Sequence, residues 1–177
     1  MIGVLVSGEG TNLQALLDAG LAVRAVATNR PGCRALDRAR AAGVAGGEFP
    51  LEEYRSRDER DAGMADWLER HGVELVVCAG YMHLLTPAFL ERFPGRIVNV
   101  HPSLLPQFPG PRAIDDALAA GVETTGVTVH LVDEGLDTGA VIAQEPVPVE
   151  PRETLAERIH EVEHELLPRV VRQLCAR

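Results

Sequence analysis

The chain contains no lysine. All 17 of its basic side chains are arginines, against 26 acidic ones, which gives a formal net charge of −9. Binding to nucleic acid depends mainly on attraction to phosphates, so this balance argues against a general nucleic-acid-binding protein, though not against a local pocket for one phosphate. Because arginine holds phosphate and carboxylate through a planar fork, we expect any anion site to use arginine, backbone N–H groups or helix N-termini.

Cysteine is scarce as well. Cys33, Cys78 and Cys175 lie far apart, are odd in number and form no Cys-x-x-Cys pair. This pattern supplies no metal motif and is typical of a reducing compartment. No stretch approaches the roughly 20 apolar residues of a membrane span, and the apolar start Met1–Val6 is too short for a signal peptide and lacks a basic leader. We therefore expect a cytoplasmic protein with no membrane partner.

Apolar runs alternate with helical patterns along the 177 residues. Strands are predicted at residues 2–6, 23–28, 44–49, 74–79, 97–100, 125–132 and 139–149, and helices at 11–19, 33–42, 57–71, 87–93, 112–120 and 153–174. Continuous apolar strands separated by helices indicate a parallel sheet covered on both faces. The last two strands follow each other through a short loop, which indicates an antiparallel addition near the C-terminal part. The fold class predicted is α/β: a single Rossmann-like domain with a mostly parallel, twisted sheet of about seven strands and helices on both faces.

The first segment that could bind a ligand is Val6-Ser7-Gly8-Glu9-Gly10-Thr11-Asn12, where a strand passes through small residues into a helix. Backbone N–H groups and the helix dipole favour an anion at such a turn. The third glycine of a dinucleotide fingerprint is missing, because Leu13 stands there, and no Gly-Lys-Ser/Thr follows. A phosphate site and a plain strand–helix turn capped by Thr11 both remain open.

A second segment, Val98–Pro106, places Asn99 and His101 two residues apart at the end of a predicted strand. Period-two geometry puts both side chains on one face, and ligands of open α/β sheets bind beyond such strand ends. An amide donor beside an imidazole suits acyl transfer, because the first stabilises a developing oxyanion and the second moves protons near neutral pH. The alternative is a strand-end histidine bonded to a loop.

Two acidic segments follow in the C-terminal part. The loop within Val132–Gly139 offers a carboxylate that would favour the protonated form of His101 if it faced the ring, although a tight connection is the commoner use of such a loop. The run His160–His164 satisfies a His-Glu-x-x-His zinc pattern on a helix. Zinc catalysis needs a third protein ligand, and no histidine follows His164. We expect no metal.

Together these segments resemble the phosphoribosylglycinamide formyltransferase family, over nearly the whole chain. The resemblance is carried by residues 7–14, 99–106, 132–139 and 160–164. It implies a nucleotide phosphate-binding half at 1–95, a catalytic and folate-binding half at 96–177, and a cis Leu105–Pro106 bond. The catalytic trio would be Asn99, His101 and Asp137. Ribonucleotide contacts would come from Gly10, Thr11, Asn12, Arg57 and Glu163. Folate contacts would come from Tyr81, Met82, His83, Leu84, Leu85, Val132 and Asp133.

The activity implied is transfer of the formyl group of 10-formyltetrahydrofolate, a co-substrate, to the amine of glycinamide ribonucleotide in de novo purine synthesis, by a monomer or homodimer. The chain departs from the family at His83, where many members carry an arginine near the folate tail, and at Arg112 and Ile114, where one branch has a His-x-His pair. The alternative activity is formyltetrahydrofolate hydrolysis. Members of the hydrolase family carry His-His-Ser where this chain has His-Pro-Ser at 101–103. A methionyl-tRNA formyltransferase would need an RNA-binding domain, and a non-catalytic nucleotide-binding module would not explain the trio.

Overall fold

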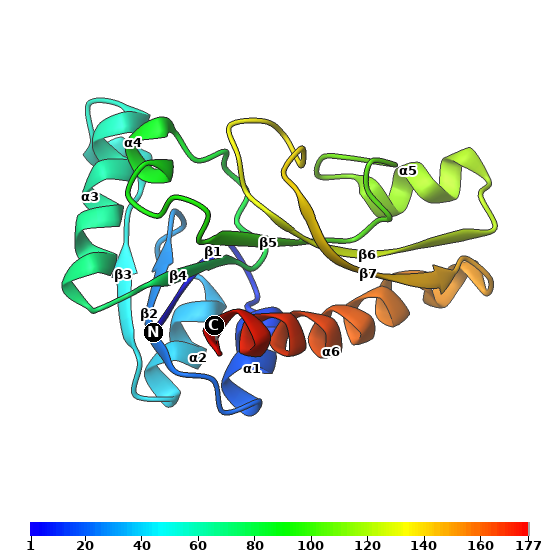
Figure 1. Cartoon of the computed structure of the whole chain (residues 1–177), viewed down its shortest axis with the longest axis horizontal. Helices are drawn as coiled ribbons and strands as arrows, with labels where there is room; N and C mark the ends of the chain where they lie inside the picture. Colours follow the sequence, from blue (N-terminus) through cyan, green and yellow to red (C-terminus); the bar gives the residue numbers. More distant parts are fainter. Residues whose placement is uncertain (177) are drawn as a thin grey trace. The chain divides into compact units, whose positions relative to one another are not determined.

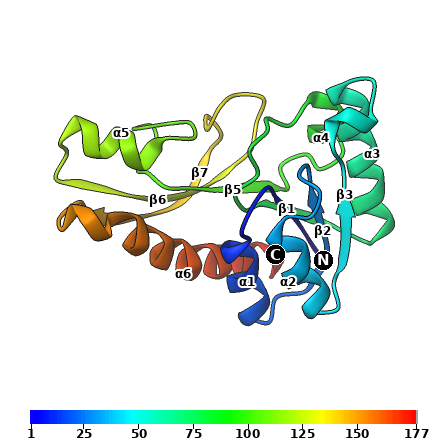
Figure 2. The same cartoon turned by 180° about the vertical axis from the view of Figure 1, so that it is seen from behind.

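The structure is a computed structural model that describes residues 1–176. The chain divides into two compact units, Met1–Val98 and Asn99–Arg177, called unit 1 and unit 2 below. Figures 1 and 2 show the chain from opposite sides.

Unit 1 is built from parallel strands and the helices that connect them. Its elements are β1 (Ile2–Val6), α1 (Thr11–Asp18), β2 (Val23–Thr28), α2 (Arg34–Ala41), β3 (Ala45–Glu48), the 3-10 turn η1 (Leu51–Glu53), α3 (Arg57–Arg70), β4 (Leu75–Cys78) and α4 (Pro87–Leu90). The strands lie in the order β3-β2-β1-β4 and pair in parallel. Because β1 is fully buried, its five residues form the centre of this unit.

Two adjacent glycines in β3 reveal the layers on either side of these strands. A Cβ on Gly46 would lie 3.1 Å from Leu36 of α2, whereas one on Gly47 would lie 2.9 Å from Trp67 of α3. Neighbouring residues of a strand face opposite ways, so α2 covers one face and α3 the other, as Figures 1 and 2 also show.

Unit 2 contains the antiparallel part of the fold. Strand β5 (Ile97–His101) enters it at Asn99 and is followed by α5 (Ala113–Ala120), β6 (Thr124–Leu131), β7 (Val141–Pro148), the 3-10 turn η2 (Arg152–Thr154) and the long helix α6 (Leu155–Cys175). The strand order is β5-β6-β7, with β6 and β7 antiparallel. Helix α6 packs along this hairpin and buries Leu155, Ile159 and Leu166.

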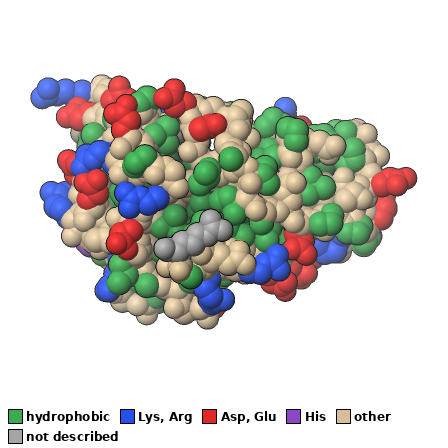
Figure 3. All heavy atoms as spheres, viewed as in Figure 1, with side chains coloured by type: hydrophobic (Ala, Val, Ile, Leu, Met, Phe, Trp, Pro, Cys, Tyr) green, Lys and Arg blue, Asp and Glu red, His purple; other side chains and the backbone are tan. Residues whose placement is uncertain are grey.

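These observations confirm the predicted α/β class, the seven strands, the mostly parallel arrangement and the antiparallel addition. The predicted helix at 87–93 is shorter, ending at Leu90. Helical spacing from Leu155 and Ile159 predicts that Val162 is buried, but Val162 is only half-buried, whereas its neighbour Glu163 is buried. Within residues 1–176, no helix is long and apolar enough to cross a membrane. Arginine and acidic side chains are interspersed over the α3 region of the surface in Figure 3.

Candidate active site

Three polar side chains of unit 2 converge as the sequence predicted. Asn99 and His101 project from the same face of β5, and Asp137 reaches both of them from the loop between β6 and β7. The amide nitrogen of Asn99 lies 3.4 Å from Oδ1 of Asp137, and Nδ1 of His101 lies 3.4 Å from Oδ2. These distances exceed the usual 2.7–3.2 Å of a good hydrogen bond, so both donors are only weakly engaged. An amide, an imidazole and a carboxylate therefore meet at one point.

The backbone decides which nitrogen of His101 can react. Nε2 lies 2.8 Å from the carbonyl oxygen of Phe108, and a carbonyl can only accept, so Nε2 carries a proton. Ser103 steadies this segment, because its hydroxyl donates to the carbonyls of Gln107, at 2.5 Å, and Phe108, at 3.3 Å. The ring is only 5% exposed. Nδ1 is therefore the nitrogen that faces Asp137.

Asp137 is held in a demanding conformation. Its φ of 54° lies in the left-handed region, which aspartate tolerates better than most residues. The N–H of Gly110 donates to Oδ2 at 2.8 Å. Burial alone would raise the pKa of the Asp137 carboxyl, but the neighbouring His130, the hydrogen bond from Gly110 and the nearby His101 together outweigh burial, so this pKa lies below its usual value. The group is thus kept as a carboxylate.

Sequence reasoning missed one imidazole of this cluster, that of His130 in β6. Its Nδ1 lies 2.7 Å from the Leu131 carbonyl, so in the neutral ring Nε2 is an acceptor. Nε2 accepts from the Asn99 amide at 3.2 Å and lies 3.6 Å from Asp137. His130 therefore orients the Asn99 amide. The sequence did contain a signal for His130. Side chains of a strand alternate between its two faces, so Val127, Val129 and Leu131 share one face and His130 lies on the other face, where it is also buried.

The loop that carries Asp137 is held by its own contacts. Oδ1 of Asp133 accepts from the Gly135 N–H at 3.0 Å and from the Thr138 hydroxyl at 2.6 Å. A Cβ at Gly135 would lie 2.0 Å from the Thr138 hydroxyl, and one at Gly139 would lie 1.8 Å from the Leu131 carbonyl. No side chain fits at either glycine. Asp133 thus has a structural part in this loop, whatever its role toward folate.

In unit 1, the predicted phosphate turn lies where β1 passes into α1. Gly10, not Thr11, is the N-cap residue, and no side chain caps the helix. The interpretation of a turn capped by Thr11 is therefore wrong, and the first N–H groups of α1 have no side-chain acceptor at the cap. Gly10 has a φ of 72°, and a Cβ there would lie 2.6 Å from the Cβ of Ala35. The turn is thus closely packed against α2 at Gly10.

The predicted folate segment of unit 1, residues 81–85, follows β4. Ser7 accepts a hydrogen bond from the Met82 N–H at 2.9 Å, and Met82 and Leu84 are 60% and 47% exposed. The guanidinium of Arg57 donates to the Leu84 carbonyl. Arg57 thus contacts the predicted folate segment, and its predicted role toward the ribonucleotide phosphate stays a prediction.

Helix α6 carries the last predicted site residue and the zinc-like pattern. Glu163 is buried; its role toward the ribonucleotide stays a prediction. Across the described 176 residues, no three histidine, cysteine or acidic side chains are placed to hold a metal ion. Elsewhere in unit 2, the Leu105–Pro106 bond is cis, as the resemblance implied.

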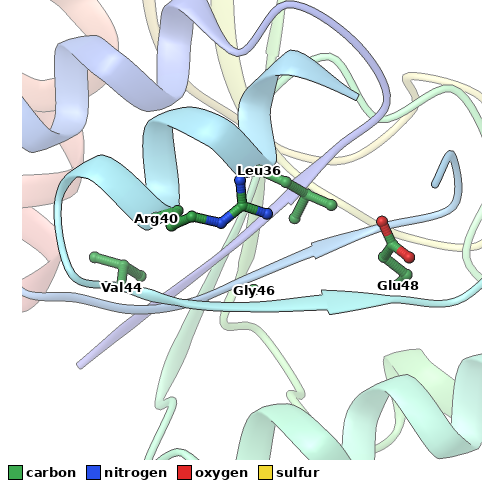
Figure 4. Close-up of a pocket in the computed structure, with 5 residues that line it drawn as sticks. All are labelled: Leu36, Arg40, Val44, Gly46 and Glu48. Atoms are coloured by element: carbon green, nitrogen blue, oxygen red, sulfur yellow. The ribbon is translucent and has the colours of Figure 1, made fainter. Parts of the chain in front are cut away.

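A hollow of about 460 Å³ lies between α2 and β3 in unit 1 (Figure 4). Leu36, Arg40, Val44, Gly46 and Glu48 line it. None of these residues was predicted to be functional, and this lining offers no nucleophile or imidazole.

Comparison with known proteins places this geometry in a family. The family model described as formyl transferase matches residues 1–171. A phosphoribosylglycinamide formyltransferase of Mycobacterium tuberculosis is 47% identical, over 97% of this chain and 83% of the relative. The trifunctional purine biosynthetic protein adenosine-3 of Chironomus tentans is 41% identical over 97% of this chain. The chain spans only 13% of that protein and 14% of the equivalent from Drosophila melanogaster.

Similarity to solved structures indicates the same family. Glycinamide ribonucleotide transformylase 1 of Geobacillus kaustophilus has a TM-score of 0.94 and 46% identity, covering 98% of this chain and 97% of that one. The enzyme of the same name from Symbiobacterium toebii has a TM-score of 0.94 and 45% identity, covering 97% and 85%. The chain belongs to the formyl transferase family.

Proposed function

We propose that the protein transfers the formyl group of 10-formyltetrahydrofolate to the amine of glycinamide ribonucleotide, a step of de novo purine biosynthesis. The products are formylglycinamide ribonucleotide and tetrahydrofolate. The observation that carries the proposal is the convergence of the Asn99 amide and Nδ1 of His101 on the Asp137 carboxylate. The names of the relatives supply the substrates.

The proposed chemistry needs no covalent bond to the protein. The substrate amine attacks the formyl carbon, and the formyl oxygen becomes an oxyanion in a tetrahedral intermediate. The Asn99 amide and protonated Nδ1 of His101 donate to that oxygen, which lowers the barrier because these donors are fixed before reaction. The bond from carbon to N10 of the folate then breaks, and the proton lost by the amine passes to N10. Asp137 keeps His101 protonated and, through water, takes the proton from the amine before that proton passes to N10.

The binding roles follow from chemistry in each unit. The backbone N–H groups of Gly10, Thr11 and Asn12, at the N-terminus of α1, suit a phosphate, and Arg57 and Glu163 suit the phosphate and the ribose hydroxyls. The folate would contact Tyr81–Leu85 of unit 1 and Val132 and Asp133 of unit 2, mostly through backbone groups. The hydrogen bond from the Met82 N–H to Ser7 and the exposed side chains of Met82 and Leu84 support the first of these assignments.

The proposal includes the setting in which the protein works. We infer that residues 1–177 act as one formyltransferase domain in the cytoplasm, as a monomer or homodimer, with small-molecule substrates, no resident metal, and no nucleic-acid or membrane partner. The acidic net charge supports the absence of nucleic acid.

A formyl-transfer assay with and without glycinamide ribonucleotide tests this function. Formylated product should form only when the amine is present. The His101→Ala variant should lose about 10²-fold or more in kcat, the typical cost of removing one oxyanion donor. Deformylation of the folate without any amine, or near-normal turnover in His101→Ala, would contradict the proposal.

A further inference from the structure

A fully buried arginine lies in unit 1, outside the catalytic trio. The side chain of Arg60 in α3 is 0% exposed, which is rare for arginine unless it is paired. Its Nε and one terminal nitrogen donate to Oδ1 of Asp61 at 2.8 and 2.6 Å. The other oxygen of Asp61 accepts from the Thr86 N–H at 2.8 Å. The buried ion pair is thus tied to the segment that follows β4.

The second terminal nitrogen of Arg60 fixes the protonation of His83. It lies 2.7 Å from Nδ1 of His83, and a guanidinium has no acceptor, so Nδ1 must accept and carries no proton. The ring is therefore neutral, with its proton on Nε2. Nε2 lies 3.3 Å from the amide nitrogen of Asn29, whose oxygen accepts from the Ser7 hydroxyl at 2.5 Å. Exchanging the oxygen and nitrogen of this amide lets the oxygen accept from Nε2 and the nitrogen donate to the Ser7 hydroxyl.

Three residues from the start of α3 hold the 82–86 segment. Arg57 donates to the Leu84 carbonyl, Arg60 to the His83 ring, and Asp61 accepts from Thr86. The side chains of Met82 and Leu84 in this segment are exposed. Hydrogen bonds to α3, and not burial, therefore hold its backbone in place. A protonated His83 would lose the contact with Arg60 and place a third cation beside Arg57 and Arg60.

The charges around His83 keep it neutral. Burial, and then Arg60 and Arg57 of α3, lower the pKa of His83, while Asp61 of α3 and Glu52 of η1 act weakly in the opposite direction. Asn29, which follows β2, is uncharged. The ring of Tyr81 lies 6.0 Å away and contributes no charge in its neutral form.

We propose that Arg60 and Asp61 are positioning residues for the formyl donor, and that they hold the 82–86 segment in its binding form only while His83 is neutral. The identity of the ligand rests on the proposed function. The arrangement combines a buried cation on α3 with an imidazole acceptor at position 83.

The test compares the wild type with His83→Gln. Glutamine can accept from Arg60 and donate to Asn29, but it never becomes charged. The KM for the formyl donor is measured from pH 8 to pH 5 with the 5,8-dideaza analogue, which lacks N5 and so cannot cyclise in acid. In the wild type this KM should rise by up to about tenfold per pH unit below the His83 pKa, because only the neutral fraction binds. His83→Gln should show no such rise, and the KM for the ribonucleotide should not separate the two proteins.

His71→Gln is the matched control, because His71 lies at the other end of α3 with its Nδ1 near the Trp67 carbonyl. It should keep the wild-type pH profile. A parallel rise of the donor KM in His83→Gln, or no rise in the wild type, would overturn the inference while leaving the formyl transfer itself intact. Absence of transfer at any pH would instead sink the proposed function.

A measurement on the free protein tests the inference without activity. Nitrogen-15 NMR of the histidine side chains should show His83 as the neutral Nε2–H form at pH 7, titrating below the value of about 6.5 of a free histidine. A ring protonated on Nδ1 at pH 7 would refute the role of Arg60.

Discussion

At the scale of single residues, Asp137 combines a charge with a left-handed backbone. Asparagine tolerates this conformation equally well, so Asp137→Asn removes the charge and keeps the backbone conformation, with its one oxygen free to accept from the Gly110 N–H. We expect kcat to fall by about 10²-fold or more, because the anion that keeps Nδ1 of His101 protonated is gone. Steady-state kinetics with a circular dichroism spectrum for each protein would check this.

The matched control lies three residues earlier in the same loop. Glu134 is exposed, and Glu134→Gln removes the same charge from the same surface without touching the cluster. It should keep wild-type kcat. Equal losses in the two variants would mean that the general negative potential matters, and not the contact of Asp137 with His101.

The residues of this cluster were predictable to different degrees. The spacing of Asn99 and His101 on one strand follows from period two alone. Asp137 came from the family resemblance, because no periodicity links a loop carboxylate to a strand 36 residues earlier. The carbonyl of Phe108 could not be predicted, since any residue supplies a carbonyl and only the backbone path brings this one to His101.

At the scale of elements, the turn before α1 depends on Gly10 for two separate reasons. Its positive φ disfavours other residues, and Ala35 of α2 leaves no room for a Cβ. Gly20 shares the positive φ, at 68°, but a Cβ added there would meet no atom within 4 Å. Gly20→Ala should cost about 1 kcal/mol of unfolding free energy for the conformation alone. Gly10→Ala should cost about 1–3 kcal/mol more, from overpacking.

Urea unfolding of both variants measures this difference. Similar costs for Gly10→Ala and Gly20→Ala would show that α2 moves away from the turn without penalty. In that case the close packing behind the proposed phosphate turn would be incidental.

Two buried threonines of β6 offer a second comparison. The hydroxyl of Thr128 donates to the Ser103 carbonyl at 2.7 Å and accepts from the Leu105 N–H at 3.1 Å and the Gln144 amide at 2.9 Å. Thr128→Val leaves these buried groups without their hydrogen-bond partner and should lower the free energy of unfolding by about 1–3 kcal/mol. The hydroxyl of Thr125 is buried with no hydrogen-bond partner among the described residues. Thr125→Val should therefore be neutral or stabilising, as thermal unfolding would show.

Element boundaries were largely predictable because the apolar runs are short and separated by glycine, proline or charge. The failures have local causes. Residues 91–93 continue an apolar and charged pattern typical of a helix, but α4 ends at Leu90 in a single turn. In α6, periodicity could not show that a carboxylate, Glu163, would be buried in place of Val162.

At the scale of the whole molecule, several titratable groups act in the same sense on acid stability. The pKa of Asp137 is lowered, and burial lowers the pKa of His83 and of His164. Each stabilises the fold above its unfolded pKa, about 3.9 for aspartate and about 6.5 for histidine, and loses that contribution as pH falls through the folded value. Stability should therefore decline below about pH 6.5.

At alkaline pH, the thiol of Cys78 lowers the stability of the fold. Burial raises the pKa of Cys78 to about 12, so its contribution is complete below the unfolded value of about 8.5 and is lost as pH rises toward the folded value. Denaturant midpoints measured from pH 4 to pH 11 should peak between these limits. Cys78→Ala should lower the midpoint at neutral pH but flatten the alkaline decline, and an unchanged decline would assign it to other groups.

The hydrogen bond from His101 to the Phe108 carbonyl also affects how readily a chemical reagent modifies this imidazole. Diethyl pyrocarbonate acylates the unprotonated, accessible nitrogen of an imidazole. In His101 one nitrogen carries a proton held by a carbonyl and the other faces a carboxylate inside the fold, whereas His160 is exposed on α6. Modification should thus reach His160 first, and labelling of His160 should leave formyl transfer intact because the backbone shields the His101 ring.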